Sequence, residues 1–511
     1  ITSLFLLLRA IYTKLVATPA SERTAEANNF IGKIEPTIWR TNKLTGTVDF
    51  KNILLTSRVV NNEGNEILRS ILETGKADED AKDNYSKNYR HFQELFDKHS
   101  TENPLMVYQF IYALLNQDIL LPITADTQDT ALTIFSTLND RGLPLSDADI
   151  FKAKIYNQLA PDDKKAFIDR WKDLDEQSTD ANESIQQLFY YNMFYYRALD
   201  KDTKTTTPGV RKYYAVNKFE RLYKPELLDT LFVILNLWKV VNKGEELEDE
   251  AWSKNIKIRQ TLDILTSYPN EYWKYPVVIY YVCYRNEENF ETRFARFLNK
   301  LLMELMTKYL MIPTINAVKP DILKLNSAIV ASDIPTFEFK TVDMTQLEPY
   351  IQNPNRNVVR MLLKTLAYEH QDDLLPAKWE IEHIFPQKWQ TNYFPDEPDA
   401  TIKEKIEHIG NKLPFEKKLN IVAGNGYFGK KKKEYIASKI VITKAMGTSD
   451  VMDWNLESIT KRDIRVSDEV VKIMNRWNNE YLNTPVSEGK AGEPSEEELA
   501  QIEKFKKNGW I

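Results

Sequence analysis

The sequence predicts a mainly helical α+β protein of several domains. Three observations support this fold class: helical spacing of apolar residues through residues 160–345, short strand-like segments toward both ends, and an ordinary globular composition. Of 511 residues, 42% are apolar and 28% are charged, with a net charge of −6. At about 150 residues per domain, this length corresponds to about three domains.

Several classes of protein are excluded at this level. The single cysteine, Cys283, excludes a disulfide framework or a Cys-rich zinc site and predicts a cytoplasmic location. No apolar run approaches the ~18–20 residues of a membrane span, so no membrane partner is expected. The acidic balance excludes a globally basic nucleic-acid coat but allows a local basic patch.

The N-terminal part alternates helical and strand-like patterns. Residues 1–17 have helical apolar spacing, and residues 50–60 read as a strand followed by a turn at residues 61–65. Residues 119–125 read as a second strand. Two helices are expected next, the first from residue 126 to the Gly142 region and the second over residues 147–159.

The middle of the chain is predicted to be a helical region with an aromatic core. Breaks are expected at residues 200–209 and 244–250, where polar and acidic residues gather. Aromatic residues recur at helical spacing throughout and are assigned to the core. The predicted domains are residues 1–158, 159–345 and 346–483, with residues 484–511 as a tail.

Chemistry-bearing residues concentrate between residues 379 and 445. Residues 379–384 (WEIEHI) alternate as a strand end and carry Glu382 and His383. Asn411 and Asn420 follow, then a Gly/Asn loop and a Lys-rich helix, which together predict a ββα unit. Residues 401–445 hold eleven Lys and four Glu, a net +7, which leaves −13 for the remainder. A local excess of positive charge in an acidic protein predicts contact with a polyanion. Without the neighbouring polar residues, the same lysines would indicate only a solvated helix.

These residue types suit phosphodiester hydrolysis. A neutral imidazole takes a proton from water near pH 7. Glu and Asn oxygens are ligands for a hard cation such as Mg²⁺, which stabilises charge on the phosphate and the leaving oxygen. Nearby Lys side chains neutralise phosphates.

The Glu-His pair occurs twice. The pattern IEHI at residues 381–384 recurs at residues 406–409. In the second copy Lys403 and Glu407 are spaced as an i,i+4 pair on a helix surface, so His408 is assigned a structural role.

The C-terminal region resembles the HNH (ββα-metal) nuclease domain of GmrSD-type, modification-dependent (type IV) restriction endonucleases. The resemblance rests on residues 381–387 (IEHIFPQ), 409–413 (IGNKL), Asn420 and 428–431 (FGKK) with Tyr435 and Ser438, and on flanks at residues 360–363 and 459–477. It implies the following roles: His383 as general base, Glu382 and Asn420 as ligands of Mg²⁺ or Mn²⁺, Asn411 as the residue that orients the His383 loop, and Lys431 and Lys430 as phosphate contacts.

Residues 132–154 resemble the second signature of the ParB-like (sulfiredoxin-like) N-terminal domain of the same family. A helix ending in Asn139-Asp140-Arg141-Gly142 and a helix beginning near Ser146 predict a phosphate pocket, or else a corner held by its own caps. The resemblance implies that Asn139, Arg141 and Gly142 bind a nucleoside triphosphate (GTP, ATP or UTP), without a P-loop. It also places an Asp-Gly-Gln-Gln-Arg motif before Ile1, so the N-terminal domain is expected to be truncated.

The resulting functional hypothesis is a DNA endonuclease of bacterial phage defence. A ParB-like domain would sense nucleotide or DNA, and a helical middle would couple it to an HNH site that cuts double-stranded DNA, modified or unmodified. Two alternatives stay open: a catalytically inactive regulator that responds to nucleotide or DNA, and a helical protein that binds an acidic partner. A homo-oligomer is compatible with each of these.

Overall fold

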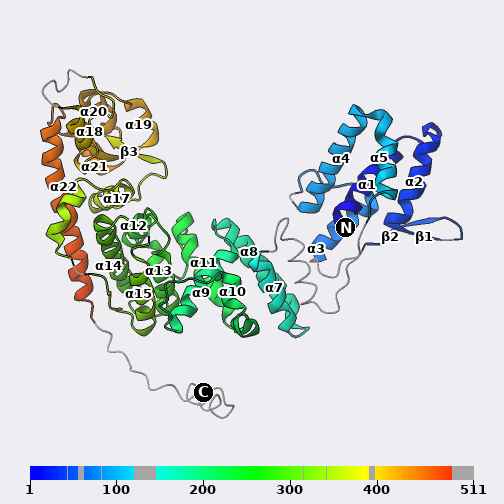
Figure 1. Ribbon diagram of the computed structural model, residues 1–511, viewed down its shortest axis with the longest axis horizontal. Coiled ribbons are helices and arrows are strands. Elements are labelled where there is room, and N and C mark those ends of the chain that lie inside the picture. The colour runs from blue at the N-terminus through cyan, green and yellow to red at the C-terminus, as the bar shows by residue number, and fades with distance from the viewer. Residues whose placement is uncertain are drawn as a thin grey trace, which may run out of the picture. The chain divides into compact units, whose positions relative to one another are not determined.

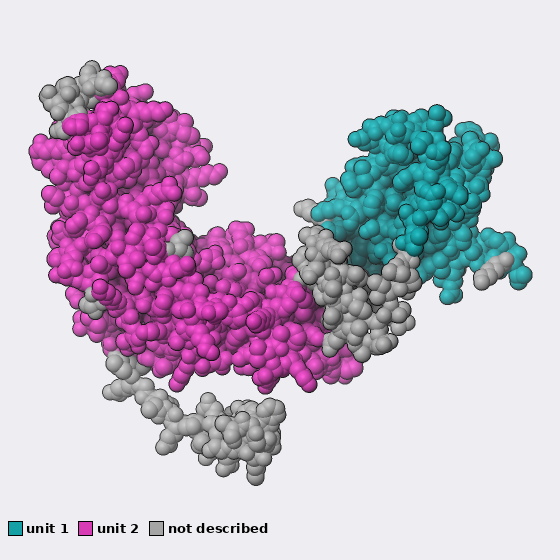
Figure 2. Space-filling view, in the orientation of Figure 1, with its two compact units in different colours: residues 1–131 teal, residues 132–511 magenta. Residues whose placement is uncertain are grey.

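The computed structural model describes residues 1–42, 44–55, 62–81, 83–119, 146–314, 316–340, 342–390 and 398–485. The chain divides into two compact units, Ile1–Ala131 and Leu132–Ile511, which Figure 2 colours separately. The described elements are mostly helices, with two short β-ribbons, which confirms the mainly helical prediction. None of the described helices combines the length and apolar character of a bilayer span.

Unit 1 is a small helical bundle with a two-stranded antiparallel ribbon (Figure 1). Its elements are α1 (Thr2–Ala17), α2 (Ala25–Ile38), β1 (Trp39–Thr41), β2 (Val48–Ile53), α3 (Asn62–Thr74), α4 (Asn84–Glu102) and α5 (Val107–Asn116). The helix predicted for residues 1–17 is confirmed by α1. Its Arg9 is 6% exposed and donates from Nε to the Leu72 carbonyl, so this buried cation ties α1 to α3.

One N-terminal prediction is wrong, and two others fall almost entirely outside the described residues. The turn predicted at residues 61–65 is wrong, because α3 begins at Asn62. Leu68, Ile71 and Leu72 are buried on one face of that helix, and this packing outweighs the local turn preference of the Asn and Gly residues. The strand predicted at residues 119–125 and the helix after it fall, apart from Ile119, outside the described residues.

Unit 2 opens with the helical region that the sequence predicts. Its helices up to residue 370 are α7 (Asp147–Gln158), α8 (Asp163–Asp180), α9 (Ile185–Leu199), α10 (Val210–Tyr214), α11 (Leu227–Lys243), α12 (Ile256–Leu265), α13 (Lys274–Tyr284), α14 (Phe290–Met311), α15 (Lys319–Ala331), α16 (Glu348–Gln352) and α17 (Val359–His370). Both predicted breaks separate helices, after Leu199 and after Lys243. Aromatic residues such as Phe189, Trp273 and Tyr280 are buried in the core, as expected.

The compact units differ from the predicted domain boundaries. Phe151 of α7 packs against Phe189 and Tyr214, with ring centroids 4.8 and 5.1 Å away, so α7 packs within unit 2. The same apolar core also contains Leu362 and Trp477, which lie beyond residue 345. The helical middle and the C-terminal region therefore share one core.

The C-terminal lobe adds a second core around a small antiparallel ribbon. Its elements are β3 (Trp379–His383), α18 (Asp399–Ile406), β4 (Lys412–Glu416), α19 (Lys417–Ala423), α20 (Phe428–Ile436), α21 (Val441–Thr448) and α22 (Leu456–Leu482) (Figure 1). A single 3₁₀ turn, Ile409–Asn411, leads into β4. The order strand, Asn-bearing turn, strand and Lys-rich helix is the predicted one, with α19 as an additional short helix.

Candidate functional site

The β3–β4 ribbon places the two residues of the first Glu-His pair on opposite faces. His383 lies across from Lys412 and Glu382 across from Leu413. Neighbouring side chains on a strand point to opposite sides, so Glu380 and Glu382 share one face while His383 shares the other with Ile381. β3 ends at His383, so His383 is the last residue of the strand on its face.

Glu382 lies in a buried cluster with two residues of α20. It is 4% exposed, and its Oε1 lies 2.7 Å from Lys431 Nζ and accepts a 2.7 Å hydrogen bond from the Tyr435 hydroxyl. Burial lowers the pKa of Lys431 against the opposing effect of Glu382. Burial also raises the pKa of Tyr435 well above its ordinary value, with a further contribution from Glu382. Spacing of one helical turn between Lys431 and Tyr435 brings both to the same carboxylate.

Asn420 reaches the same face of β3 from α19. Its Nδ2 donates to Glu380 Oε2 at 3.1 Å, and Lys417 Nζ lies 3.4 Å from Glu380 Oε1. The structure thus pairs Asn420 with Glu380, two residues before Glu382. Sequence reasoning missed Glu380, although its position two residues from Glu382 on a strand is the signal that both share a face.

Two oxygens on this face are candidate ligands for a hard divalent cation. Both contacts of Glu382 fall on Oε1, and Asn420 uses only Nδ2, so Glu382 Oε2 and Asn420 Oδ1 accept no hydrogen bond from the described residues. Two hard oxygens left over in this way suit Mg²⁺, which typically uses one or two carboxylates and completes its shell with water and phosphate. No cluster of three or more His, Cys, Asp or Glu side chains suited to a metal occurs among the described residues.

His383 lies in a polar cluster on the other face. Its Nε2 is 3.4 Å from Gln387 Nε2 and 3.5 Å from Glu407 Oε1, and Glu407 Oε2 is 2.9 Å from Lys412 Nζ. Burial lowers the pKa of His383, and the charge of Glu407 only partly opposes this. The imidazole is therefore held neutral near pH 7, the state that can accept a proton.

The position of Glu407 corrects a sequence prediction. The spacing pairs Glu407 with Lys403 on a helix surface, but α18 ends at Ile406, so Glu407 lies just beyond the helix. From there it contacts Lys412 and approaches His383 instead. Burial would raise the pKa of Glu407, but the hydrogen bond and charge of Lys412 outweigh it and lower the pKa.

Asn411 is fully buried and fixes the chain that follows His383. Its Oδ1 accepts from the Phe385 amide at 2.7 Å, and its Nδ2 donates to the carbonyls of Phe385 and Ile406, each at 3.0 Å. Trp454 Nε1 also donates to Oδ1 at 3.2 Å, and the Ile384 amide donates to the Asn411 carbonyl at 2.9 Å. These bonds hold the segment after β3 against the turn before β4.

Two adjacent residues of α22 bind the backbone of the turn before β4. Arg462 Nη1 donates to the carbonyls of Ile409, Gly410 and Lys412, at distances of 2.8–3.1 Å. Asp463 accepts from the Gly410 amide at 2.7 Å and contacts His408 Nδ1 at 2.7 Å. His408 thus serves the turn rather than the His383 cluster. Sequence reasoning missed the Arg462–Asp463 pair, since nothing local signals contacts some 50 residues away.

Gly410 is required by this close approach, which gives a stability prediction. A Cβ at position 410 would lie 2.3 Å from the Ile459 carbonyl oxygen and 2.6 Å from Asp463 Oδ1. We expect Gly410→Ala to destabilise the protein by about 2–3 kcal/mol, because α22 must move away. Urea unfolding measures this, with Gly209→Ala as control, where a Cβ meets nothing within 4 Å. Equal stability of the two variants would contradict the close approach.

The two predicted phosphate contacts have different surroundings. Lys430 is exposed, whereas Lys431 is 1% exposed and its Nζ donates to the His383 carbonyl at 2.5 Å as well as pairing with Glu382. Lys431 is therefore buried and already paired, whereas Lys430 is open to solvent. The position of Lys431 links Glu382 to the backbone of His383.

The predicted nucleotide residues Asn139, Arg141 and Gly142 lie outside the described residues. The helix start predicted near Ser146 lies among the described residues. Ser146 caps α7: its hydroxyl oxygen accepts from the Asp149 amide at 3.1 Å and its hydroxyl donates to Asp149 Oδ2 at 2.7 Å. The cap is confirmed as a local feature of unit 2.

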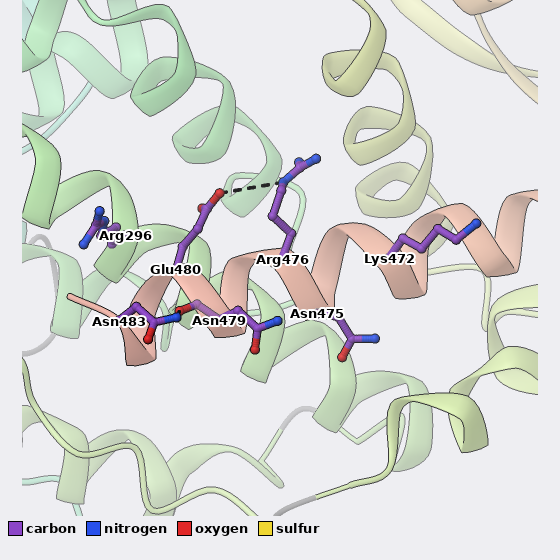
Figure 3. A pocket seen from close by; sticks show the side chains of 7 residues that line it. All are labelled: Arg296, Lys472, Asn475, Arg476, Asn479, Glu480 and Asn483. Atoms are coloured by element: carbon purple, nitrogen blue, oxygen red, sulfur yellow. Dashed lines mark hydrogen bonds and ion pairs between the residues drawn. The ribbon is translucent and has the colours of Figure 1, made fainter.

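A separate polar depression of about 570 Å³ lies along the C-terminal half of α22 (Figure 3). Its residues are Arg296, Lys472, Asn475, Arg476, Asn479, Glu480 and Asn483. Arg476 pairs with Glu369 at 2.7 Å, and Lys472 pairs with Asp468 at 2.7 Å. With no imidazole and a single carboxylate, this depression lacks the groups for phosphodiester hydrolysis.

Two family models match this sequence, and one of them covers the region of the candidate site. The model of the GmrSD restriction endonucleases, C-terminal domain, matches residues 343–466, and that of the GmrSD restriction endonuclease, N-terminal domain, matches residues 1–156. A search of curated proteins found no match. The β3–β4 ribbon, Asn411, Asn420 and the Lys-rich helix all fall within the C-terminal match.

The chain belongs to the GmrSD restriction endonuclease family. Family membership identifies it as a restriction endonuclease of phage defence, with DNA as the substrate.

Proposed function

We propose that unit 2 cleaves double-stranded DNA by metal-dependent hydrolysis at an HNH-type site. The observation that carries the proposal is the half-buried imidazole of His383, at the end of a strand whose other face carries Glu382 beside Asn420 of α19. One oxygen of each of these two residues accepts no hydrogen bond from the described residues. His383 accepts the proton of the attacking water. Asn411 positions His383 by fixing the backbone that follows it.

Glu382 and Asn420 are the residues that would hold Mg²⁺ or Mn²⁺. Such an ion stabilises negative charge on the phosphate and on the leaving oxygen. Lys431 holds Glu382 in place through the buried ion pair, and the exposed Lys430 contacts a DNA phosphate. Glu407 and Lys412 restrain the imidazole on its own face of the ribbon.

A plasmid assay with a variant of Asn420 tests the metal assignment. We expect Asn420→Ala to lower cleavage in Mg²⁺ by about 10- to 100-fold or more, because a ligand oxygen is lost. The matched control is Asn425→Ala, an exposed residue five positions later. Activity of Asn420→Ala equal to that of the control would contradict the assignment. Glu382→Gln is less clean, since it leaves the buried Lys431 ammonium without its partner.

The pH dependence of cleavage tests the role of His383. Its pKa is lowered from 6.5, chiefly by burial, so the imidazole becomes protonated at a lower pH than an ordinary histidine. Protonation removes the general base, so the rate falls only as the pH drops through this lowered pKa. Single-turnover rates from about pH 5 to pH 8 should therefore have an acid limb centred below 6.5. An acid limb centred above 6.5 would argue against the half-buried imidazole of His383 as the base.

The N-terminal part is proposed to sense nucleotide or DNA through Asn139, Arg141 and Gly142. Adding GTP, ATP or UTP to the plasmid assay, with modified and unmodified DNA, tests this coupling. The rival function is a regulator without nuclease activity, for which the ion pair of Glu382 with Lys431 is the supporting observation. The absence of product with every combination of metal, nucleotide and DNA would favour that regulator.

A further inference from the structure

The short helix α19 has an unusual outward face. Its inward residues are Asn420, bonded to Glu380, and the buried Ala423. The outward residues Ile421 and Val422 are 68% and 60% exposed, and Tyr427 in the following turn is 57% exposed. A surface helix usually turns its apolar residues inward, as α19 does with Leu419 and Ala423, so the adjacent outward Ile421 and Val422 indicate a contact surface. We call Ile421, Val422 and Tyr427 the α19 tip.

Lysines surround the α19 tip. Lys418 is exposed and lies one helical turn before Val422, on the same side of α19, whereas the exposed Lys417 pairs with Glu380. The stem of Lys430 packs over Gly426, where a Cβ would lie 3.0 Å from Lys430 Cδ. Apolar side chains ringed by cations do not suit a second copy of the chain, because like charges would face each other. They suit a polyanion that also offers an apolar interior.

The location of the α19 tip beside the proposed site favours DNA as its binding partner. α19 carries Asn420 on its inner side, directly before Ile421, and it lies beside β3 in the C-terminal lobe (Figure 1). Because Ile421 directly follows Asn420 in α19, the α19 tip borders the proposed site, where a bound duplex would pass. Apolar wedges that enter between base steps are a device of minor-groove binding.

We propose that the α19 tip enters the minor groove of the DNA substrate and partly unstacks a base step beside the scissile phosphate. Ile421 and Val422 form the wedge, Tyr427 packs against the exposed sugar or base, and Lys418 and Lys430 contact flanking phosphates. The proposal rests on the proposed function for the position of the scissile phosphate. It adds that the protein distorts the duplex through apolar contacts, separately from the chemistry of His383.

Fluorescence of duplex DNA that carries 2-aminopurine at several central positions tests the wedge. The full-length protein is added in EDTA, so that no cleavage occurs, and binding is followed separately by anisotropy. We expect the wild-type protein to raise 2-aminopurine emission, because the probe brightens when it is unstacked. The double variant Ile421→Ser/Val422→Ser should bind DNA with the same salt dependence but produce no rise.

Two controls show whether the rise in emission comes from the wedge itself. Ile464→Ser changes another exposed isoleucine, 58% exposed on α22, and should retain the rise. Lys418→Ala and Lys430→Ala should each reduce the slope of binding against salt by about 1 while retaining the rise at saturation. The wild-type protein failing to bind DNA, a bound complex without the rise, or a rise retained in the double variant would each overturn the proposal.

The outcome is independent of the proposed chemistry. His383→Ala and Asn420→Ala should keep the 2-aminopurine signal whether or not they still cleave. If the catalytic assignment is wrong, the fluorescence experiment therefore still tests the wedge. A change of oligomeric state in the Ile421→Ser/Val422→Ser variant, together with an unchanged DNA signal, would assign the α19 tip to self-association and overturn the proposal.

Discussion

His383→Ala is expected to slow DNA cleavage by about 100- to 10,000-fold, the range that a general base contributes. The loss should fall on the rate of the chemical step, because His383 makes only long contacts at 3.4 and 3.5 Å and supports little of the fold. DNA affinity and the free energy of unfolding should change little, by about 1 kcal/mol or less. Single-turnover cleavage of plasmid DNA, with anisotropy and urea unfolding alongside, measures all three.

The second Glu-His copy supplies the matched control. His408 lies 2.7 Å from Asp463 and belongs to the network that holds the 408–412 turn. His408→Ala should therefore lower stability while the folded fraction cleaves close to the wild-type rate. The opposite pattern, with rate lost in His408→Ala and kept in His383→Ala, would reverse the assignment of the two histidines.

Asn411→Ala is expected to have the largest effect on stability in the C-terminal lobe. The side chain is fully buried and makes four hydrogen bonds, and its loss leaves the Phe385 amide and the carbonyls of Phe385 and Ile406 without these partners. Each buried polar group left unpaired costs about 1–3 kcal/mol, so a total near 3 kcal/mol or more is expected. Urea unfolding measures the cost, with Asn479→Ala on the exposed side of α22 as control.

Asn411→Ala should also impair cleavage at temperatures where the protein stays folded. The Phe385 amide lies two residues after His383, so its release lets the imidazole move. Faster hydrogen exchange at the amides of Ile384 and Phe385 should accompany the lower rate. A stable variant with normal exchange and a normal rate would show that Asn411 does not position His383.

The sequence was informative where a pattern reflects a local rule. Helical spacing predicted α1 and α7, and the alternation at residues 379–384 predicted β3. The strand rule also anticipated that Glu382 and His383 face opposite sides. A turn-rich segment at residues 61–65 misled, because the burial of Leu68 and Leu72 decides the helix and is invisible locally.

The parts of the site that escaped prediction depend on distant contacts. Arg462 and Asp463 reach the turn before β4 across about 50 residues, and no spacing rule connects them. Glu407 lies beyond the end of α18 by a single residue, which is enough to turn it from a surface pair toward His383 and Lys412. Lys431 lies on the inner face of α20 and Lys430 on the exposed side, a difference fixed by packing against Glu382.

Anomalous diffraction from crystals of the His383→Ala variant grown with DNA and Mn²⁺ tests the central claim most directly. The account predicts a manganese peak within ligand distance of Glu382 Oε2 and Asn420 Oδ1, with a DNA phosphate oxygen beside it. A peak elsewhere, or DNA bound with no peak near these two oxygens, would contradict the proposed site.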